Sequence, residues 1–567
     1  MLSYRKLAMR VLGRPLHTEG IDSPRPASQR AAAFILTAAM LTTLAAPAFA
    51  GTWYIEDGNI TISAGESGNN VTQNNNTTYG DTNTIITNQN KDTASSNTVT
   101  IEAKDKDDTV EVTLKDVNID ASSRNNAAVS VTGSGNTTIK LDGDNALKSD
   151  TYRSGIYGSG SLTISGGTVT ANGDDGGRGI SSRGGVTISG GSTVTANGGN
   201  GTISGGDGIC SSGGVTISGG STVTANGGNG GSIGGGSGIY SNGSVTISGG
   251  TVTANGGKGG SGYGGDGIRS LDHVAISGGT VTANGGNSTN SSGGYGIISL
   301  DVAISSGTVT ANGGDSKDGY GGDGIHSNGV TISSGTVNAA GGYGGKVGGY
   351  GICSFDRVAI SGGTVEAAGG NGSTGGGSGI YSSVIDLSGS LELTAKAGSP
   401  TGKALLQNGR ELDLDTIKDK LGPGAKVTAT DANGDSKQVS GPRPVEPEEP
   451  VIPEESSSSS DGGSATPSAP VSPLPGLTVT DKDGQRISYT STQSGNTLTV
   501  CVGRLTASLH VSLAALRQLR AEGIETITFQ TILCSTTLSV DELLAMGGED
   551  AEAVLTHRLT DSSLTGG

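Results

Sequence analysis

Cysteine, aromatic residues and charge are all scarce in this chain of 567 residues. There are 4 cysteines, 1 tryptophan and 4 phenylalanines, and charged side chains make up only 15%. Four cysteines are too few for the disulfide framework of a small secreted scaffold. With so few rings, the core must be thin and built from small and β-branched residues, unlike the large mixed core of a typical soluble enzyme.

Glycine, by contrast, is abundant. There are 103 glycines, about 18% of the chain against a usual level near 7%. Glycine does not recur at every third position, which excludes collagen.

The first fifty residues predict a cleaved secretory signal (1–50). A basic leader precedes an apolar run over 31–44 and an A-x-A site at Ala48–Ala50. That run is shorter than the ~20 residues that span a bilayer, and no second long run exists. Loss of six basic and two acidic residues makes the net charge of −17 more negative still. We therefore expect an extracellular or cell-surface protein without membrane insertion and without nucleic acid as a partner.

Two short phrases recur in step along the chain, every 24 to 30 residues. The phrase V-T-I-S-G-G has its isoleucine at Ile164, Ile188, Ile217, Ile247, Ile276, Ile304, Ile332 and Ile360. The dipeptide Gly-Ile has its isoleucine at Ile156, Ile180, Ile209, Ile239, Ile268, Ile297, Ile325, Ile352 and Ile380. Two independent markers that keep step indicate a true structural repeat.

Each repeat contains three strand-like pieces, for example Gly238–Tyr240, Val245–Ile247 and Val252–Ala254, separated by glycine-rich corners. Three strands per turn of about 28 residues predict a mainly β fold, a parallel β-helix with a rise of about 4.8 Å per turn. It should run for about 13 turns over residues 51–430. The predicted inward columns are Val215/Val245/Val274, Ile217/Ile247/Ile276, Val223/Val252/Val281 and Ala225/Ala254/Ala283.

The rest of the chain divides by composition. Residues 51–150 are predicted as the N-terminal cap and first irregular turns, with Trp53 plugging the end, and 151–440 as the regular helix and its C-terminal end. Residues 441–475 read as a Pro/Glu/Ser linker. Residues 476–567 predict a small α+β domain, with Ser512 capping one helix and Ser539 beginning a second.

The cysteines offer no clear chemistry. Cys210 and Cys353 occupy the same place five turns apart, roughly 24 Å at strand spacing, whereas a disulfide needs Cα atoms within about 7 Å. Cys501 and Cys534 lie in one short segment, where either a disulfide or two free thiols is compatible with the sequence.

Histidines and aspartates give no catalytic residue, no metal site and no cofactor. No two histidines have metal-ligand spacing, and His326 is expected to be a solvated surface residue. Asp207, Asp266 and Asp323 each precede a Gly-Ile pair. They fit corner stabilisation better than a calcium site, although weak calcium binding stays open.

The tyrosines give the candidate ligand-binding site. Tyr263, Tyr295, Tyr320 and Tyr350 fall in the loop between the second and third strands, in pairs two turns apart, or roughly 10 Å. Exposed amphipathic rings at this spacing predict binding of a polysaccharide along one edge of the tube. The alternative is that these rings only anchor glycine-rich loops.

Threonine pairs also form an outward array on six turns: Thr168/Thr170, Thr193/Thr195, Thr222/Thr224, Thr251/Thr253, Thr280/Thr282 and Thr308/Thr310. The pattern resembles the T-x-T face of β-helical ice-binding proteins. Ordinary β-propensity on a solvated face explains it equally.

The V-T-I-S-G-G-T-V-T-A-N-G-G and G-I-x-S phrases over 130–395 resemble the β-helical carbohydrate-binding domains of secreted proteins from anaerobic Gram-positive bacteria. Similar phrases occur in adhesins. The architecture is more distantly similar to pectate lyases, which implies a groove with clustered carboxylates for calcium and a basic proton acceptor. No positions here match that pattern.

We therefore expect a secreted or cell-surface, non-catalytic β-helix protein that binds polysaccharide or a host or cell-surface glycan. The main alternative is a structural spacer or adhesin for protein partners; a lyase-like enzyme and an ice-binding protein are minor ones. An enzyme would need two carboxylates, or a carboxylate and a base, converging on one substrate position.

Overall fold

A computed structural model describes residues 50–442 and most of the chain from 477 to 566. In the second part the described ranges are 477–481, 484–487, 489–494, 496–502, 506–531, 535–545, 552–557 and 562–566. Nearly all of the predicted signal peptide and linker lie outside these ranges. The chain forms two compact units, one up to Glu449 and one from Pro450.

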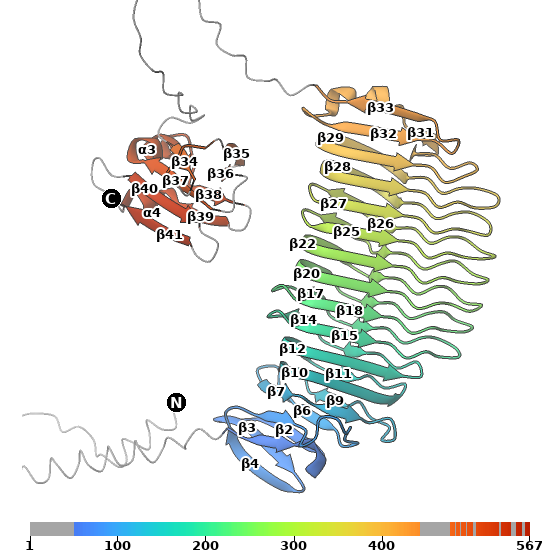
Figure 1. Cartoon of the computed structure of the whole chain (residues 1–567), viewed down its shortest axis with the longest axis vertical. Helices are drawn as coiled ribbons and strands as arrows, with labels where there is room; N and C mark the ends of the chain where they lie inside the picture. Colours follow the sequence, from blue (N-terminus) through green and yellow to red (C-terminus); the bar gives the residue numbers. More distant parts are fainter. Residues whose placement is uncertain are drawn as a thin grey trace, which may run out of the picture. The chain divides into compact units, whose positions relative to one another are not determined.

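The first unit is a parallel β-solenoid of about 14 turns, one more than predicted, so the predicted fold class is confirmed (Figure 1). A typical turn consists of β19 (Ile239–Ser241) followed by β20 (Val245–Asn255), which bends at its glycines and serves two sheets. Each strand pairs in parallel with its equivalent in the next turn, as in Ile239 with Ile268 and Val245 with Val274. The result is three parallel sheets, here called A, B and C in chain order.

The strands of the three sheets have the following bounds. Sheet A contains β2 (Ile60–Gly65), β6 (Val99–Glu102), β9 (Val129–Thr132), β11 (Ile156–Gly158), β13 (Ile180–Ser182), β16 (Ile209–Ser211), β19, β21 (Ile268–Ser270), β23 (Ile297–Ile298), β26 (Ile325–Ile332), β28 (Ile352–Ala368), β29 (Ile380–Lys396) and β30 (Leu405–Gln407). Sheet B contains β1 (Thr52–Tyr54), β5 (Ile85–Thr87), β7 (Thr109–Lys115), β10 (Asn136–Thr151), β12 (Ser161–Asp174), β14 (Val186–Ser189), β17 (Val215–Ile217), β20, β22 (His273–Asn284), β24 (Asp301–Ile304) and parts of β26, β28 and β29. Sheet C contains β8 (Asn118–Asp120), parts of β10 and β12, β15 (Thr193–Asn197), β18 (Thr222–Asn226), parts of β20 and β22, β25 (Thr308–Asn312), β27 (Thr336–Ala340), parts of β28 and β29, and β32 (Lys426–Thr430).

The core is the stack of inward columns that the alternation predicts. Val245, Ile247, Val252 and Ala254 are all 0% exposed, and the equivalent residues of neighbouring turns are buried with them. Identical side chains lie one above another because parallel pairing in register repeats the same position at every turn. Val, Ile and Ala suit such a narrow tube because β-branched side chains pack well on a pleated surface.

Both ends of the solenoid are closed. At the N-terminal end β2, β3 (Gly68–Gln73) and β4 (Asn76–Asp81) form an antiparallel meander, and Trp53 packs against the core with its Nε1 donating to Asp81. At the C-terminal end β33 (Ser436–Ser440) pairs antiparallel with β32, near β31 (Arg410–Glu411) and the short helix η2 (Leu414–Lys420). Covered ends prevent edge-to-edge pairing with another chain.

Long glycine-rich loops carry the chain from sheet C back to sheet A and stack on one another (Figure 1). Backbone hydrogen bonds join the two arms of each loop, as in Gly265 N to Gly257 O (2.8 Å). Others join neighbouring loops, as in Gly257 N to Gly236 O (2.8 Å). A Cβ on Gly257 would lie 2.0 Å from the carbonyl oxygen of Gly228. This close backbone approach explains the glycine content. We call these loops, residues 198–208 and their equivalents up to 369–379, the glycine loop stack.

An asparagine ladder marks the junction between sheet C and the glycine loop stack. Each Nδ2 donates to the Oδ1 of the preceding asparagine at 2.8 Å. The members are Asn172, Asn197, Asn226, Asn255, Asn284 and Asn312. The ladder ends at Ala340, the residue that pairs with Asn312. Amide side chains thus satisfy one another turn by turn.

Within its described residues, the second unit contains two four-stranded sheets and two short helices, as expected for a small α+β domain. One sheet consists of β34 (Leu477–Thr480), β37 (Ala507–Ser512), β40 (Glu552–His557) and β41 (Ser562–Gly566); the other consists of β35 (Thr490–Ser494), β36 (Thr497–Cys501), β38 (Thr526–Gln530) and β39 (Ser535–Ser539). The helices are α3 (Leu513–Ala521), capped by Ser512, and α4 (Val540–Ala545). Phe529, 0% exposed, is part of its core. No helix in the described part of the chain has the length and apolarity to span a membrane.

Candidate ligand-binding groove

A groove runs along the solenoid between the outer face of sheet A and the glycine loop stack. It consists of two cavities of about 470 and 540 Å³ that share Arg178, Ser204, Asp207 and Gly235. Tyr152 lines the first cavity. The second is lined by three more rings, Tyr240, Tyr263 and Tyr295. Both volumes fall within the usual range of ligand sites.

One wall of the groove is part of a longer column, here called the wall column, that lies two residues before each Gly-Ile isoleucine from Ile180 on. Its members are Arg178, Asp207, Ser237, Asp266, Tyr295, Asp323, Tyr350 and Ser378. Aspartate occurs in every second turn from Asp207 to Asp323, so successive carboxylates are roughly 10 Å apart. Calcium ligands lie about 2.3–2.6 Å from the ion, so no two of these carboxylates can share one calcium.

Each aspartate of this column stabilises a corner. One oxygen accepts the backbone N–H of the equivalent residue in the next turn: Ser237 N to Asp207 (2.9 Å), Tyr295 N to Asp266 (2.8 Å) and Tyr350 N to Asp323 (2.7 Å). The predicted role of these aspartates is therefore confirmed.

The other oxygen of each aspartate meets a basic side chain. Arg178 Nε lies 3.2 Å from Asp207, Arg269 Nη1 lies 3.0 Å from Asp266, and His326 Nδ1 lies 2.7 Å from Asp323. We call these three arrangements the Asp niches. Burial raises the pKa of the Asp266 carboxyl, while the amide of Tyr295 and the guanidinium of Arg269 act in the opposite direction.

The four predicted tyrosines do not form one row. Tyr263 and Tyr320 are exposed on the loop stack, by 64% and 52%. Tyr295 and Tyr350 belong to the wall column and are only partly exposed. Of the four, Tyr263 and Tyr295 line the second cavity, whereas Tyr320 and Tyr350 line neither cavity. Tyr320 lies instead beside Lys346, whose Nζ is 5.7 Å from the ring centroid.

The two wall tyrosines pack against side chains of the neighbouring turn. Tyr295 stacks on His326 at 4.4 Å between ring centroids, and Tyr350 stacks on Tyr381 at 5.1 Å. Burial raises the pKa of both tyrosine hydroxyls, which keeps them neutral hydrogen-bonding groups. The prediction that His326 is a solvated surface residue is wrong, because its side chain is only 19% exposed and contacts Tyr295 and Asp323.

Sequence reasoning missed Arg178, which lines both cavities of the groove. Arg178 stands in a G-G-R-G-I phrase, in the same place as the aspartates of G-G-D-G-I. Arg269 follows its Gly-Ile pair, and its guanidinium lies 6.0 Å from the centroid of Tyr240 in the preceding turn. A comparison of equivalent positions turn by turn, rather than a search by residue type, would have found the charged pairs.

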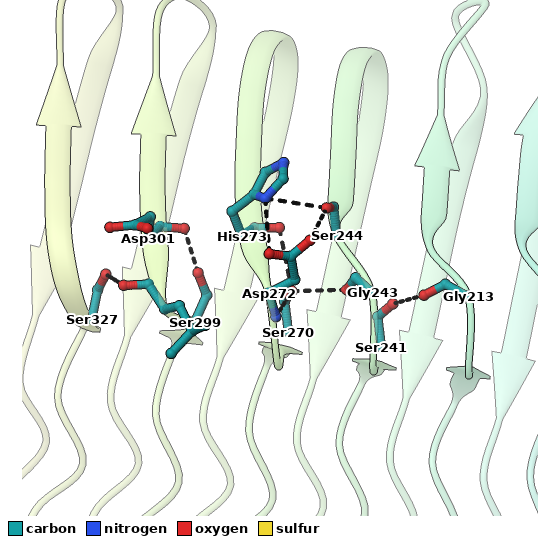
Figure 2. Close-up of polar contacts among 11 residues, drawn as sticks. Gly213, Ser241, Gly243, Ser244, Ser270, Asp272, His273, Ser299, Asp301 and Ser327 are labelled. Atoms are coloured by element: carbon teal, nitrogen blue, oxygen red, sulfur yellow. Dashed lines mark hydrogen bonds and ion pairs between the residues drawn. The ribbon is translucent and has the colours of Figure 1, made fainter.

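A serine, an aspartate and a histidine also meet at the corner between sheets A and B (Figure 2). Ser244 Oγ donates to Asp272 Oδ2 (2.7 Å) and lies 3.2 Å from His273 Nδ1. Asp272 Oδ1 lies 3.2 Å from the same Nδ1. A catalytic triad needs serine and carboxylate on opposite nitrogens of the ring, so this group is not one. The bond from Ser244, followed by that from His273, lowers the pKa of Asp272.

The same close-up shows a column of buried serines that follow the Gly-Ile pairs (Figure 2). Ser241 Oγ donates to Gly213 O (3.2 Å), and Ser270 Oγ donates to Gly243 O (2.9 Å). These hydroxyls satisfy corner carbonyls of the preceding turn, so the serine of G-I-x-S has a structural role.

Cys210 and Cys353 are free and lie in one column of sheet A, five turns apart, as predicted. Burial raises the pKa of the Cys210 thiol to about 11. Cys501 is also free, and Cys534, its predicted alternative partner, lies outside the described residues.

Four segments of the solenoid match the family model of the beta helix repeat. The matched residues are 162–185, 245–268, 274–297 and 302–329. All four segments begin in a strand of sheet B and continue through sheet C to the next Gly-Ile pair or a few residues beyond it. The beta helix repeat thus describes the architecture and gives no ligand. Comparison with curated proteins and with solved structures gives no significant match.

Proposed function

We propose that this chain is a secreted or cell-surface, non-catalytic β-helix protein that binds a polysaccharide in the groove of sheet A. The observation that carries the proposal is the pair of joined cavities, which extends across successive turns and suits an elongated ligand. The basic leader, apolar run and A-x-A site support export.

The lining of the groove has the chemistry of sugar recognition. Tyr240 and Tyr263 present amphipathic rings, which can stack on a sugar face and hydrogen-bond through their hydroxyls. Arg178 and Arg269 present several N–H donors beside carboxylate acceptors. Because each arginine is paired with an aspartate, these pairs add little net charge, and a neutral or weakly charged polysaccharide is the ligand class that fits best.

The same pairing argues for binding rather than catalysis. In each Asp niche one carboxylate oxygen accepts a backbone amide and the other meets a basic side chain. A general base must instead be directed at a substrate proton. The carboxylates are also roughly 10 Å apart along the wall, so they do not converge on one position.

A glycan array probed with the full chain tests the proposal. The variant Tyr240→Ala/Tyr263→Ala removes two rings from the second cavity and should lose at least about tenfold in affinity for any polysaccharide bound, since each buried ring contributes about 1 kcal/mol or more. The matched control is Tyr320→Ala/Tyr343→Ala, which removes two exposed rings of the loop stack that do not line the cavities.

Equal loss in both double variants would move the site to the loop stack, and unchanged binding in both would move it away from the tyrosines altogether. Absence of binding to any glycan would overturn the proposal. The alternative, a structural spacer or an adhesin that binds a protein partner, would then replace it.

A further inference from the structure

The three Asp niches share a frame but differ in the group that faces the second carboxylate oxygen. In two of them it is a guanidinium, Arg178 or Arg269, which carries a permanent positive charge. In the third it is the imidazole of His326, and the thiol of Cys353 from the next turn lies beside it. Where two niches contain a fixed cation, the third contains three metal-ligating groups.

These three groups lie close together in a sheltered place. One ligand atom each of Asp323, His326 and Cys353 falls within 4.8 Å of the others. Cys353 is 3% exposed, and the side chains of Asp323 and His326 are 9% and 19% exposed. The imidazole edge therefore leaves a route for an ion, while the rest of the group is shielded from water.

The ligand side chains are also held in place by groups that are not ligands. Asp323 accepts the amide of Tyr350 at 2.7 Å, which fixes its carboxylate. The ring of His326 is stacked on Tyr295 at 4.4 Å and meets the edge of Phe355 at 5.2 Å. Such supporting contacts orient metal ligands and strengthen binding.

We propose that Asp323, His326 and Cys353 bind a zinc ion. Carboxylate oxygen, imidazole nitrogen and thiolate sulfur are the three ligand types of zinc, at about 2.0–2.3 Å from the ion. Three protein ligands leave a fourth tetrahedral position for water or a ligand oxygen. Calcium and magnesium are disfavoured, since they prefer sites made of oxygen alone.

Zinc binding at this site releases protons. The Cys353 thiol must lose its proton to bind, and so must His326 Nδ1 where that atom carries one and serves as the ligand. A bound dication favours the thiolate. Affinity for zinc should therefore rise with pH.

The chain supplies its own control in Cys210. This cysteine lies in the same column as Cys353 and near an aspartate of the same wall, but its niche contains Arg178 in place of a histidine. If a buried thiol beside a carboxylate were sufficient, both cysteines would bind metal. If the histidine is required, only the niche of Cys353 will.

The experiment is a Zn²⁺ titration of the full chain against a chromophoric chelator, after removal of bound metal. Cys353→Ser and His326→Gln should each lose one zinc site or weaken it at least about tenfold, while Cys210→Ser should bind as the parent does. Substitution by Co²⁺ should give a thiolate-to-metal charge-transfer band that disappears in Cys353→Ser. Circular dichroism checks that each variant keeps its β structure.

The proposal is overturned if Cys353→Ser binds zinc with the stoichiometry and affinity of the parent, or if the parent with Co²⁺ shows no band that depends on Cys353. If Cys353→Ser fails to fold, His326→Gln decides: loss of the zinc site supports the proposal, and zinc binding with the stoichiometry and affinity of the parent overturns it. Cysteines and histidines of the C-terminal unit are present in every variant, so any metal they bind does not affect the comparison.

Discussion

The solenoid and the C-terminal unit bury apolar surface in opposite ways. In the solenoid, a core residue such as Ile247 lies between two copies of itself, Ile217 and Ile276, about one turn away on either side. In the C-terminal unit, Phe529 belongs to a mixed core of leucine, valine and alanine that both helices and several strands contribute. The first core is a series of equal layers, and the second is a single cluster.

This difference predicts that a destabilising substitution in the core will have different effects in the two units. A repeat protein is stabilised by each turn and its contacts with the neighbouring turns, so a local defect should stay local. A small domain with one core usually unfolds as a single cooperative unit. Hydrogen exchange measured along the full chain can separate the two behaviours, because it reports opening segment by segment.

The largest effect is expected for Ile247→Asp. This side chain is 0% exposed, and a carboxylate placed there would have no partner in a dry stack. We expect a loss of more than about 4 kcal/mol, seen as lost amide protection in β17, β20 and β22 with the C-terminal unit unchanged. Thr246→Asp, at the outward position of the same strand, is the control and should stay close to the parent. An Ile247→Asp variant that melts like the parent would show that the column assignment is wrong.

Phe529→Ala should have the second largest effect and the opposite pattern. Truncation of a buried phenylalanine costs about 3–5 kcal/mol, and here it removes a ring that is 0% exposed. Protection should be lost across β36, β38 and both helices together, while the solenoid keeps its protection. The control is Thr528→Ala on the other face of β38. Loss confined to β38 would contradict the view of one cooperative core.

A third variant tests the glycine loop stack. Gly257→Ala places a Cβ 2.0 Å from the carbonyl oxygen of Gly228, so the stacked backbones must separate. Forced overpacking costs roughly 1–3 kcal/mol, and the loss should appear in the loops next to residue 257. Gly249→Ala is the matched control, because a Cβ there has no atom within 4 Å. It should be neutral or stabilising by about 0.4–1 kcal/mol. Equal thermal stability of the two variants would show that the loops do not pack as described.

The smallest effect concerns pH. Ser244→Ala removes the hydrogen bond that lowers the pKa of Asp272, so that pKa should rise toward its ordinary value. A carboxyl with a depressed pKa contributes stability above its unfolded pKa and loses that stability as the pH falls through the folded value. The parent should therefore keep this contribution to a lower pH than the variant. Carboxyl chemical shifts of Asp272 followed by NMR between pH 2 and 6 check the direction.

Much of the solenoid could be predicted from the sequence, because the repeated phrases mark equivalent positions in every turn. The columns of Val, Ile and Ala, the corner role of Asp207, Asp266 and Asp323, and the common column of Cys210 and Cys353 were all predicted. Each prediction needs only the period and the alternation of a strand. The cap of α3 at Ser512 was predictable for a similar reason, since capping is local in the chain.

The groove was predicted less well because it depends on contacts between turns. The row of four tyrosines was inferred from spacing, yet Tyr295 stacks on a histidine of the next turn and only Tyr263 and Tyr320 extend from the loops. The partners of the aspartates also come from different places: Arg269 and His326 from the same turn, and Arg178 from the preceding one. Periodicity fixes which positions are neighbours, but the conformation of each side chain depends on its particular neighbours.

In the wall column an aspartate occurs at every second turn from Asp207 to Asp323. The charge pattern of this column therefore repeats every two turns, although the fold repeats every turn. If the turn from Ile209 to Gly238 were deleted, the solenoid would keep its register, because Ile209 pairs with Ile239, but Asp207 and Asp266 would become neighbours at about 4.8 Å. Two carboxylates would then repel each other where one now accepts the amide of an uncharged residue. Deletion of two adjacent turns would preserve the alternation. Gain and loss of repeats in this part of the protein should therefore be tolerated in pairs, so the solenoid would lengthen or shorten in steps of about 10 Å.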